Sequence, residues 1–269
     1  MNSVNRETRE ILSFYLDAGA DALVGEEAVD RMADDVAPPA PVAIRPPSPP
    51  QTVRKEPARI VSQPAALASP DAAIMAAREA AKTAANLDDL RTLLDNFTGC
   101  PLRNTATQIV FADGNPQSRV MFVGEAPGYE EDISGKPFVG RSGKLLDRMI
   151  EAIGLDRTTA YIANVVPWRP PGNRTPTPQE TAICLPFVRR QIELANPDIL
   201  VCLGGPSAQT LLGIKDGITR TRGRWFTFDT GTREIRALAT FHPAFLLRSP
   251  LQKRLAWRDF LAIKKALAA

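Results

Sequence analysis

The chain contains one histidine, His242, within the segment TFHPAFLLR at residues 240–248. An imidazole can donate a hydrogen bond or transfer a proton near neutral pH, so a histidine used once is a candidate for chemistry. Leu246, Leu247 and Arg248 follow it. Leucines beside an arginine at the tip of a turn are typical of a wedge that separates stacked bases while the arginine binds a phosphate. The alternative is ordinary core packing of the histidine and both leucines.

Carboxylates gather in the segment GEAPGYEEDISGKPFVG, residues 124–140. Glu125 and Glu131 are suited to orienting a water molecule or to stabilising a developing positive charge. A phosphate-binding loop is excluded, because the glycine spacing does not match the Walker A motif and the segment is acidic. A plain tight turn around the first glycines is the alternative.

A carboxamide opens the segment NVVPWRPPGNRTPTPQE, residues 164–180. The side chain of Asn164 can donate and accept hydrogen bonds together, which suits the Watson–Crick edge of a base. The alternative is an asparagine that caps a loop. Arg169 and Arg174 lie in the same proline-rich stretch, which we expect to be ordered and exposed, and both are candidates for contacting nucleic acid.

From about residue 98 onward, short apolar runs alternate with amphipathic stretches. The predicted strands span residues 119–124, 160–166, 198–204 and 234–241, and the predicted helices span 142–153, 178–195, 206–212 and 250–268. This alternation predicts a parallel sheet with helices on both faces. Ligands of such sheets bind beyond the carboxyl ends of the strands. We therefore expect Glu125, Asn164 and His242 to meet at one edge of the sheet.

The N-terminal part of the chain has a different composition. Residues 1–35 are predicted to form an amphipathic helix with an acidic polar face. Residues 36–70 are rich in proline and alanine, which is typical of an extended, disordered linker. Residues 71–269 are predicted to form the folded domain. It begins with an alanine-rich helix at 71–97, for which Asp71 is the expected N-cap.

Charge and cysteine content narrow the class of protein. The net charge is +3, but residues 1–90 hold an excess of acidic side chains and residues 91–269 an excess of basic ones. A basic domain favours a polyanionic partner, although a solvated basic surface is the simpler alternative. Three cysteines, an odd number, indicate a reducing compartment. Neither a membrane span nor a secretory signal is recognisable, so we expect a cytoplasmic protein.

Taken together, three segments carry a family resemblance. GEAPGYEEDISGKPFVGRSGKLLDRM, YIANVVPWRPPGNRTPTPQE and FHPAFLLRSP resemble the motifs of bacterial family-4 uracil-DNA glycosylases, in register from about Phe97 to the C-terminus. The resemblance implies an α/β fold, a three-layer αβα sandwich around a four-stranded, mainly parallel central sheet. It also implies a repair enzyme that acts on uracil in DNA.

The resemblance implies roles for individual residues. Phe138 would stack on the extruded uracil, Asn164 would pair with its N3–H and O4, and His242 would face O2. Glu125, with Glu131 as the second candidate, would position the attacking water and stabilise positive charge on the sugar. The implied uracil contacts are completed by the backbone of Ala126, Pro127 and Gly128.

The implied DNA contacts lie on two loops. Leu247 and Arg248 would occupy the space that the flipped base vacates. The full set of expected DNA-contacting residues is Arg169, Arg174, Leu246, Leu247 and Arg248.

The chain departs from the family at the positions of its iron–sulfur cluster. Most family-4 enzymes hold a [4Fe–4S] cluster with four cysteines, whereas here the matching positions are Phe97, Cys100, Trp168 and Cys184. Because such a cluster normally needs four ligands, we expect no cluster, no other metal and no cofactor. Phe97 and Trp168 are expected to fill the volume by aromatic packing.

The reaction we expect is monofunctional hydrolysis of the N-glycosidic bond of deoxyuridine, which leaves an abasic site. No lysine is placed as a Schiff-base nucleophile, and the basic insertion of a related, covalently trapping branch is missing, so neither lyase activity nor trapping is expected. The alternative is a non-catalytic protein that binds uracil or abasic sites.

The expected partner is uracil-containing DNA, single- or double-stranded. The N-terminal helix has a possible protein partner of its own, such as a polymerase or a scaffold. We further expect a monomer in the bacterial cytoplasm that associates with the nucleoid during repair.

Overall fold

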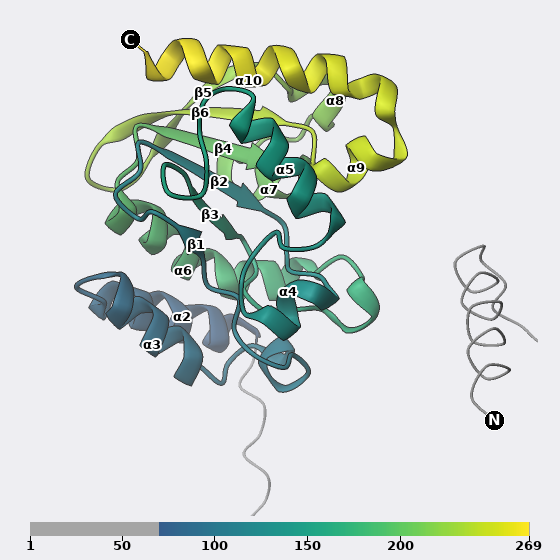
Figure 1. Cartoon of the computed structure of the whole chain (residues 1–269). Coiled ribbons are helices and arrows are strands. Elements are labelled where there is room, and N and C mark those ends of the chain that lie inside the picture. Colours follow the sequence, from purple (N-terminus) through teal and green to yellow (C-terminus); the bar gives the residue numbers. More distant parts are fainter. Residues whose placement is uncertain (1–69, 269) are drawn as a thin grey trace, which may run out of the picture. The chain divides into compact units, whose positions relative to one another are not determined.

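A six-stranded mixed sheet forms the centre of the protein in this computed structural model, which describes residues 70–268 (Figure 1). The helix expected at 1–35 and nearly all of the linker expected at 36–70 lie outside the described residues. The strand order is β1-β3-β2-β4-β6-β5. The strands are β1 (Asp113–Gly114), β2 (Val120–Gly124), β3 (Tyr161–Asn164), β4 (Ile199–Leu203), β5 (Trp225–Asp229) and β6 (Glu234–Thr240).

The four central strands are parallel, as the sequence predicts. β3, β2, β4 and β6 pair in parallel in that order. The sequence analysis missed the two edge strands, β1 and β5, which pair antiparallel with β3 and β6. The predicted αβα sandwich with a mainly parallel sheet is therefore confirmed, with an antiparallel strand added at each edge.

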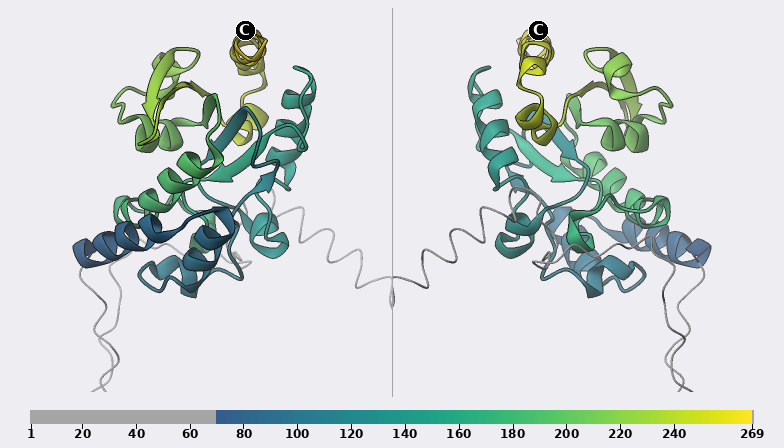
Figure 2. Two further views of the ribbon diagram at one scale, coloured as in Figure 1. Left: turned by 90° about the vertical axis from the view of Figure 1, so that its left-hand side faces the viewer. Right: turned by 90° about the vertical axis from the view of Figure 1, so that its right-hand side faces the viewer.

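Helices cover both faces of this sheet, as Figures 1 and 2 show. On one face lie α5 (Arg141–Glu151) and α10 (Lys253–Leu267). On the other lie α6 (Pro178–Ala195) and α7 (Gly205–Leu212), and α2 (Pro70–Thr83) and α3 (Leu87–Asn96) pack on α6. The shorter helical segments are η1 (Pro101–Asn104), α4 (Tyr129–Ser134), η2 (Pro171–Asn173), α8 (Ile218–Thr221), α9 (Pro243–Arg248) and η3 (Pro250–Gln252).

Alternating side chains of the central strands build two separate cores. In β2, Phe122 joins the cluster on the side of α5 and α10, whereas Met121 and Val123 join the cluster on the side of α6. All five residues of β2 and of β4 are buried. This two-sided burial explains why the strands are continuous apolar runs rather than alternating ones.

The leading helix differs from its prediction. A single helix was expected at 71–97, but the chain forms α2 and α3 with a break between them. Asn86 causes the break, because its side chain accepts a hydrogen bond from the backbone N–H of Asp89 (2.8 Å) and so caps a new helix. Asp71 lies in the first turn of α2 rather than at its N-cap.

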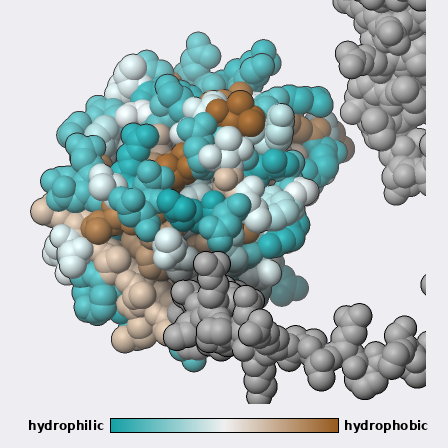
Figure 3. Space-filling view, turned by 90° about the horizontal axis from the view of Figure 1, so that it is seen from below, coloured by the Kyte–Doolittle hydropathy of each residue, from teal (hydrophilic) through white to brown (hydrophobic). Residues whose placement is uncertain are grey.

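The face of the protein that is seen from below relative to Figure 1 is largely polar. Figure 3 shows hydrophilic side chains over much of the face seen from below, with strongly hydrophobic side chains only in separate spots. Between residues 70 and 268, none of the helices combines the length and the apolar composition that a membrane span requires.

Candidate active site

The carboxyl ends of the central strands form one edge of the sheet, and a cavity of about 490 Å³ lies there. Gly124 of β2 is in register with Asn164 of β3, and Leu203 of β4 with Thr240 of β6. The loops after these strands therefore converge. The cavity lining includes Glu125, Ala126, Pro127, Gly128, Glu131, Phe138, Asn164, Arg174, His242 and Arg248. Segments more than 100 residues apart in the chain thus contribute to one site.

Phe138 provides an aromatic wall. Its side chain is 4% exposed, and its ring centroid lies 5.4 Å from that of His242. A Cβ added at Gly124 would come within 2.6 Å of the Phe138 ring and 2.4 Å of Asn164 Oδ1. A glycine is therefore required at the end of β2, because only its missing side chain lets the ring and the carboxamide share that space.

Asn164 presents an unused acceptor. The residue is 4% exposed, and its Oδ1 atom has no hydrogen-bond partner within the described part of the chain. A buried polar atom left unpaired costs about 1–3 kcal/mol. This cost would be removed by a ligand that donates a hydrogen bond, so the carboxamide is built to receive an N–H group.

Glu125 is the second buried group without a partner. Its Oε1 atom makes no hydrogen bond to residues 70–268. Burial raises the pKa of the Glu125 carboxyl above its ordinary value, and a hydrogen bond with the Thr175 side chain opposes this rise. Thr175 also lines the cavity, and the sequence analysis did not identify it. The Glu125 carboxyl is available to hold a water molecule or to face a positive charge.

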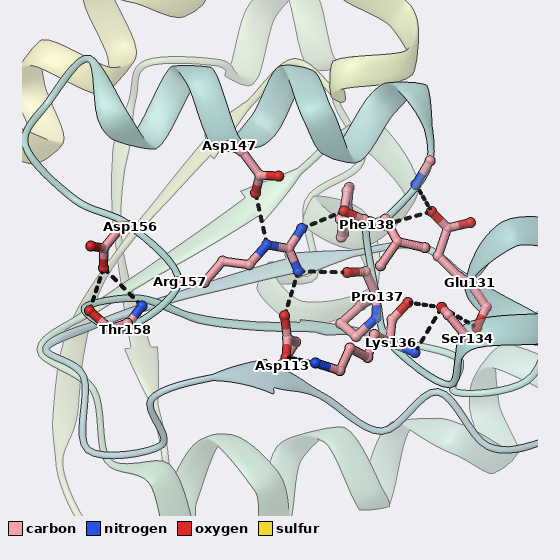
Figure 4. Close-up of polar contacts among 12 residues, drawn as sticks. Asp113, Glu131, Ser134, Lys136, Pro137, Phe138, Asp147, Asp156, Arg157 and Thr158 are labelled. Carbon is pink, nitrogen blue, oxygen red and sulfur yellow. Dashed lines mark hydrogen bonds and ion pairs between the residues drawn. The ribbon is translucent and has the colours of Figure 1, made fainter.

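Glu131 is engaged differently. Its Oε2 atom accepts a hydrogen bond from Gly128 N–H, and its Oε1 atom accepts two from Val139 and Gly140 N–H, all at 3.0 Å. Figure 4 shows part of this arrangement. The carboxylate ties the loop before α4 to the loop before α5. The structure thus separates two candidates that the sequence left together: Glu125 has a free oxygen, whereas Glu131 is occupied by the backbone.

Glu131→Gln is expected to lower the free energy of unfolding by roughly 2 kcal/mol, because an amide has one acceptor oxygen and must place its NH2 group against a backbone donor. Urea unfolding of both proteins measures the difference. Glu130→Gln is the matched control, because Glu130 is an exposed carboxylate of the same helix. Equal stability of the wild type and the Glu131 variant would contradict this assignment.

His242 lies just past the end of β6, as expected, and is the N-cap residue of α9. Its Nδ1 atom accepts a hydrogen bond from Ala244 N–H (3.1 Å), so Nε2 carries the proton of the neutral ring. Burial, together with the nearby charge of Arg248, lowers the pKa of His242 from 6.5 to about 4, and the negative charge of Glu131 opposes this shift only weakly. The imidazole is therefore neutral at physiological pH and can act as a hydrogen-bond donor.

The expected leucine wedge is only partly exposed. Leu247 is 37% exposed and Arg248 is exposed, but Leu246 is 1% exposed and packs with Phe241 and Ala256. Leu246 is therefore buried in this structure, and Leu247 and Arg248 are the exposed residues of the expected wedge. The segment is helical, and adjacent side chains on a helix cannot point the same way.

The two arginines of the proline-rich loop hold that loop together. Arg174 donates two hydrogen bonds to Glu180, at 2.9 and 2.7 Å, while still lining the cavity. Arg169 donates to Asn173 Oδ1 (2.7 Å) and lies over the Tyr129 ring at 5.0 Å. Both arginines have protein partners that the sequence did not reveal.

The backbone segment expected to contact uracil lines the cavity, but one of its N–H groups already has a hydrogen-bond partner. Ala126, Pro127 and Gly128 line the cavity. The N–H group of Gly128 is already donated to Glu131, so it is not free for a ligand.

The positions of the family's cluster ligands do not fit an iron–sulfur cluster. Cys100 and Cys184 are fully buried free thiols, and a hydrogen bond between their side chains lowers the pKa of Cys100 and raises that of Cys184. Trp168 is 1% exposed, and Phe97 packs edge-on against Phe187 at 5.1 Å. Within residues 70–268, no three His, Cys, Asp or Glu side chains are grouped to hold a metal. Two thiols and two aromatic rings cannot supply four ligands.

Comparison with known proteins shows similarity to uracil-DNA glycosylases. The family model described as "Uracil DNA glycosylase superfamily" matches residues 111–261. A Type-4 uracil-DNA glycosylase of Thermotoga maritima is 46% identical over 153 residues, which are 56% of this chain and 78% of that protein. A Type-4 uracil-DNA glycosylase of Archaeoglobus fulgidus is 38% identical over 182 residues, 66% of this chain and 92% of that protein. The one of Saccharolobus solfataricus is 39% identical over 189 residues, 68% of this chain and 88% of that protein.

Proposed function

The chain belongs to the uracil-DNA glycosylase superfamily, and on that premise we propose that it hydrolyses the N-glycosidic bond of deoxyuridine in DNA, releases uracil and leaves an abasic site. One observation carries the proposal beyond family membership. Two buried oxygens without partners among the described residues, on Glu125 and Asn164, lie in one cavity with a neutral imidazole. These groups match three requirements of the reaction: the Glu125 oxygen can hold the attacking water, the Asn164 oxygen can bind the base, and the imidazole can stabilise charge on the base as it leaves.

Recognition requires that the uracil base leaves the DNA double helix. A uracil stacked in a duplex is out of reach, so the nucleotide is flipped into the cavity at a cost of a few kcal/mol. Phe138 stacks on the base, and Asn164 Oδ1 accepts the hydrogen bond from N3–H while its amide donates to O4. Leu247 and Arg248, which are both exposed and of which Arg248 lines the cavity, contact the DNA that the base has left.

The same carboxamide discriminates against cytosine. Cytosine has no proton on N3 and carries an amino group at C4, so both of its groups oppose those of Asn164. A ligand that leaves a buried polar group unpaired is rejected strongly. The unpartnered Oδ1 of Asn164 supports this role.

Cleavage separates charge. As the bond between N1 and C1′ breaks, negative charge develops on uracil and positive charge on the deoxyribose. The Nε2 proton of neutral His242 stabilises the charge at O2, and the Glu125 carboxylate faces the sugar and orients the attacking water. No lysine or second histidine takes part, so the enzyme is monofunctional and does not remain attached to DNA.

We further propose that the protein works without an iron–sulfur cluster. Phe97 and Trp168 stand at two of the four ligand positions, and their packing supports a core held by aromatic contacts instead. The reaction as derived above uses side chains of the chain alone.

The proposed function also suggests an oligomeric state, a cellular location and a partner. We propose a monomer that acts on uracil in single- or double-stranded DNA, in the cytoplasm of a bacterium and at its nucleoid. The acidic segment at residues 1–35 is proposed to bind a protein partner.

An excision assay tests the function. A labelled oligonucleotide with one uracil is incubated with the protein, and abasic sites are then cleaved with alkali. We expect a product strand with the uracil substrate and none with a thymine control. Metal analysis of the same preparation is expected to find no stoichiometric iron. A retained gel shift without product would instead indicate a binding protein, and four iron atoms per chain would refute the cluster-free proposal.

A further inference from the structure

Phe138 has an unusual backbone conformation. Its φ angle is +56°, in the left-handed region that residues with a side chain rarely adopt. This conformation costs about 1–2 kcal/mol. Such strain persists only where surrounding contacts fix it, and here it belongs to the residue whose ring forms a wall of the cavity. The contacts that fix it are therefore contacts that aim the ring.

Peptide groups on both sides of Phe138 are held from two directions (Figure 4). On one side, Glu131 accepts hydrogen bonds from the N–H groups of Val139 and Gly140. On the other side, the Arg157 guanidinium donates to the carbonyl of Pro137 at 3.1 Å and to the carbonyl of Phe138 itself. Four hydrogen bonds thus fix the chain around one strained residue.

Arg157 is itself anchored. Its Nη1 atom donates to Asp113 Oδ2 (2.6 Å) in β1, and its Nε atom donates to Asp147 Oδ1 (2.8 Å) in α5. Figure 4 shows the guanidinium lying between these carboxylates and the two carbonyls. With both carboxylates in place, the planar group has a fixed orientation, which a flexible ammonium would not have.

Space around the Phe138 carbonyl is fully used. A Cβ added at Gly143 would lie 1.7 Å from this oxygen, so α5 contacts it directly and only a glycine fits there. The carbonyl is enclosed by α5 and by Arg157. Without the guanidinium it would be left unpaired, and the nearest relief is rotation of the backbone out of the left-handed region, which moves the ring.

We propose that Arg157 is a positioning residue for base stacking: it holds Phe138 in the left-handed conformation that aims the ring at the flipped base. The inference rests on the proposed role of Phe138. Arg157 is not among the described residues that line the cavity, so it acts through Phe138 and not on the substrate.

The test compares Arg157→Lys with Arg233→Lys. Arg233 is a matched control, because it donates to the carbonyls of Asn196 and Pro197 and to Asp198, at the opposite edge of the sheet. A small displacement of a positioning group can reduce a rate by up to 10²-fold. We expect Arg157→Lys to lower the single-turnover excision rate by about 10- to 10²-fold and Arg233→Lys to leave it unchanged, with all assays run where circular dichroism shows a folded protein.

A double mutant shows whether the effect passes through the ring. Phe138→Ala removes the ring, so adding Arg157→Lys to it is expected to cause less than a twofold further loss. Affinity for uracil-free duplex should stay unchanged in the Arg157 variant. Asp147→Asn is the second variant if Arg157→Lys does not fold. It loosens one anchor of the guanidinium, and we expect a smaller loss of rate in the same direction.

The outcomes distinguish a failure of the positioning role proposed for Arg157 from a failure of the proposed function. A wild-type rate in the Arg157 or Asp147 variant that folds, an equal loss in Arg233→Lys, or a full further loss on top of Phe138→Ala would each overturn the proposal for Arg157. A wild-type rate in Phe138→Ala would instead overturn the proposed role of Phe138. No excision by the wild type would overturn the proposed function.

Discussion

His242→Ala is expected to lower the single-turnover rate of uracil excision by about 10²–10³, the usual cost of removing one donor from a developing negative charge. The physical reason is the fixed tautomer: Ala244 N–H bonds to Nδ1, so the Nε2 proton is available for O2 of the leaving uracil. Alanine offers no donor in its place. The rate is measured with enzyme in excess over a labelled single-uracil oligonucleotide.

Two controls make this result specific. Affinity for uracil-containing DNA, measured by gel shift, should fall much less than the rate, because the donor acts mainly when the bond breaks. In the Glu125→Gln background, where the Glu125 carboxyl no longer titrates, the residual rate should show no change around pH 6.5, because the pKa of His242 is about 4. Equal turnover by His242→Ala, or a step near pH 6.5 in the Glu125→Gln profile, would remove the role given to the neutral imidazole.

The same pKa has a consequence for stability. The pKa of His242 lies below the ordinary value of 6.5 in the folded protein, so the unfolded chain binds the proton first as the pH falls. The contribution of His242 to folding is therefore present above pH 6.5 and is lost between pH 6.5 and about 4. Burial of the neutral ring, which the proposed mechanism uses as a donor, therefore also makes the fold sensitive to acid.

The parallel centre of the fold could be predicted because its strands have a clear sequence signature. β2 and β4 are buried on both faces, which requires continuous apolar runs that are easy to recognise. The edge strands lack that signature. β1 has two residues, and most residues of β5 are partly or fully exposed, so only pairing with β3 and β6 defines them.

The location of the site followed from the fold, since the residues after parallel strands must meet at one edge. The division of work within the site did not follow. Glu125 and Glu131 are six positions apart in one acidic loop, and nothing local distinguishes them. The difference arises from three backbone amides, two of which belong to the loop before α5.

Long-range contacts also hid the other features that the sequence did not reveal. Leu246 and Leu247 are identical in type, and only the packing of α9 against Phe241 buries the first and exposes the second. Arg157 follows Phe138 by 19 positions and has no motif of its own. Its partners become visible only when β1, α5 and the loop before β3 are placed together.

Unpaired polar groups distinguish the site from the rest of the domain. Among the described residues, the buried side-chain oxygens without a hydrogen bond are Glu125 Oε1 and Asn164 Oδ1, and both belong to this cavity. Leaving them unpaired destabilises the folded state. Under the proposed function, substrate and water complete the hydrogen bonds that these two oxygens lack.

Glu125→Gln is expected to lower the excision rate by on the order of 10²–10³, because the amide neither faces the sugar cation with a charge nor accepts a proton from water. Glu130→Gln, which removes the same charge from an exposed position nearby, should keep the wild-type rate. A wild-type rate in Glu125→Gln would contradict the assignment.

The pH profile of Glu125→Gln gives an independent check. Burial raises the pKa of Glu125, and catalysis needs the ionised form, so the wild-type rate should fall as the pH drops through a value above 4.5. This acidic limb should be missing in the variant.

The stability of the wild type should depend on pH in the opposite direction to its rate. A carboxyl with a raised pKa favours folding below its unfolded pKa and loses that contribution as the pH rises. At neutral pH, where the wild type keeps a buried charge, Glu125→Gln should be at least as stable as the wild type in urea. A variant that is slower yet no less stable is the result expected of a catalytic carboxylate, and a variant that is both slower and clearly less stable would assign Glu125 to the framework of the loop.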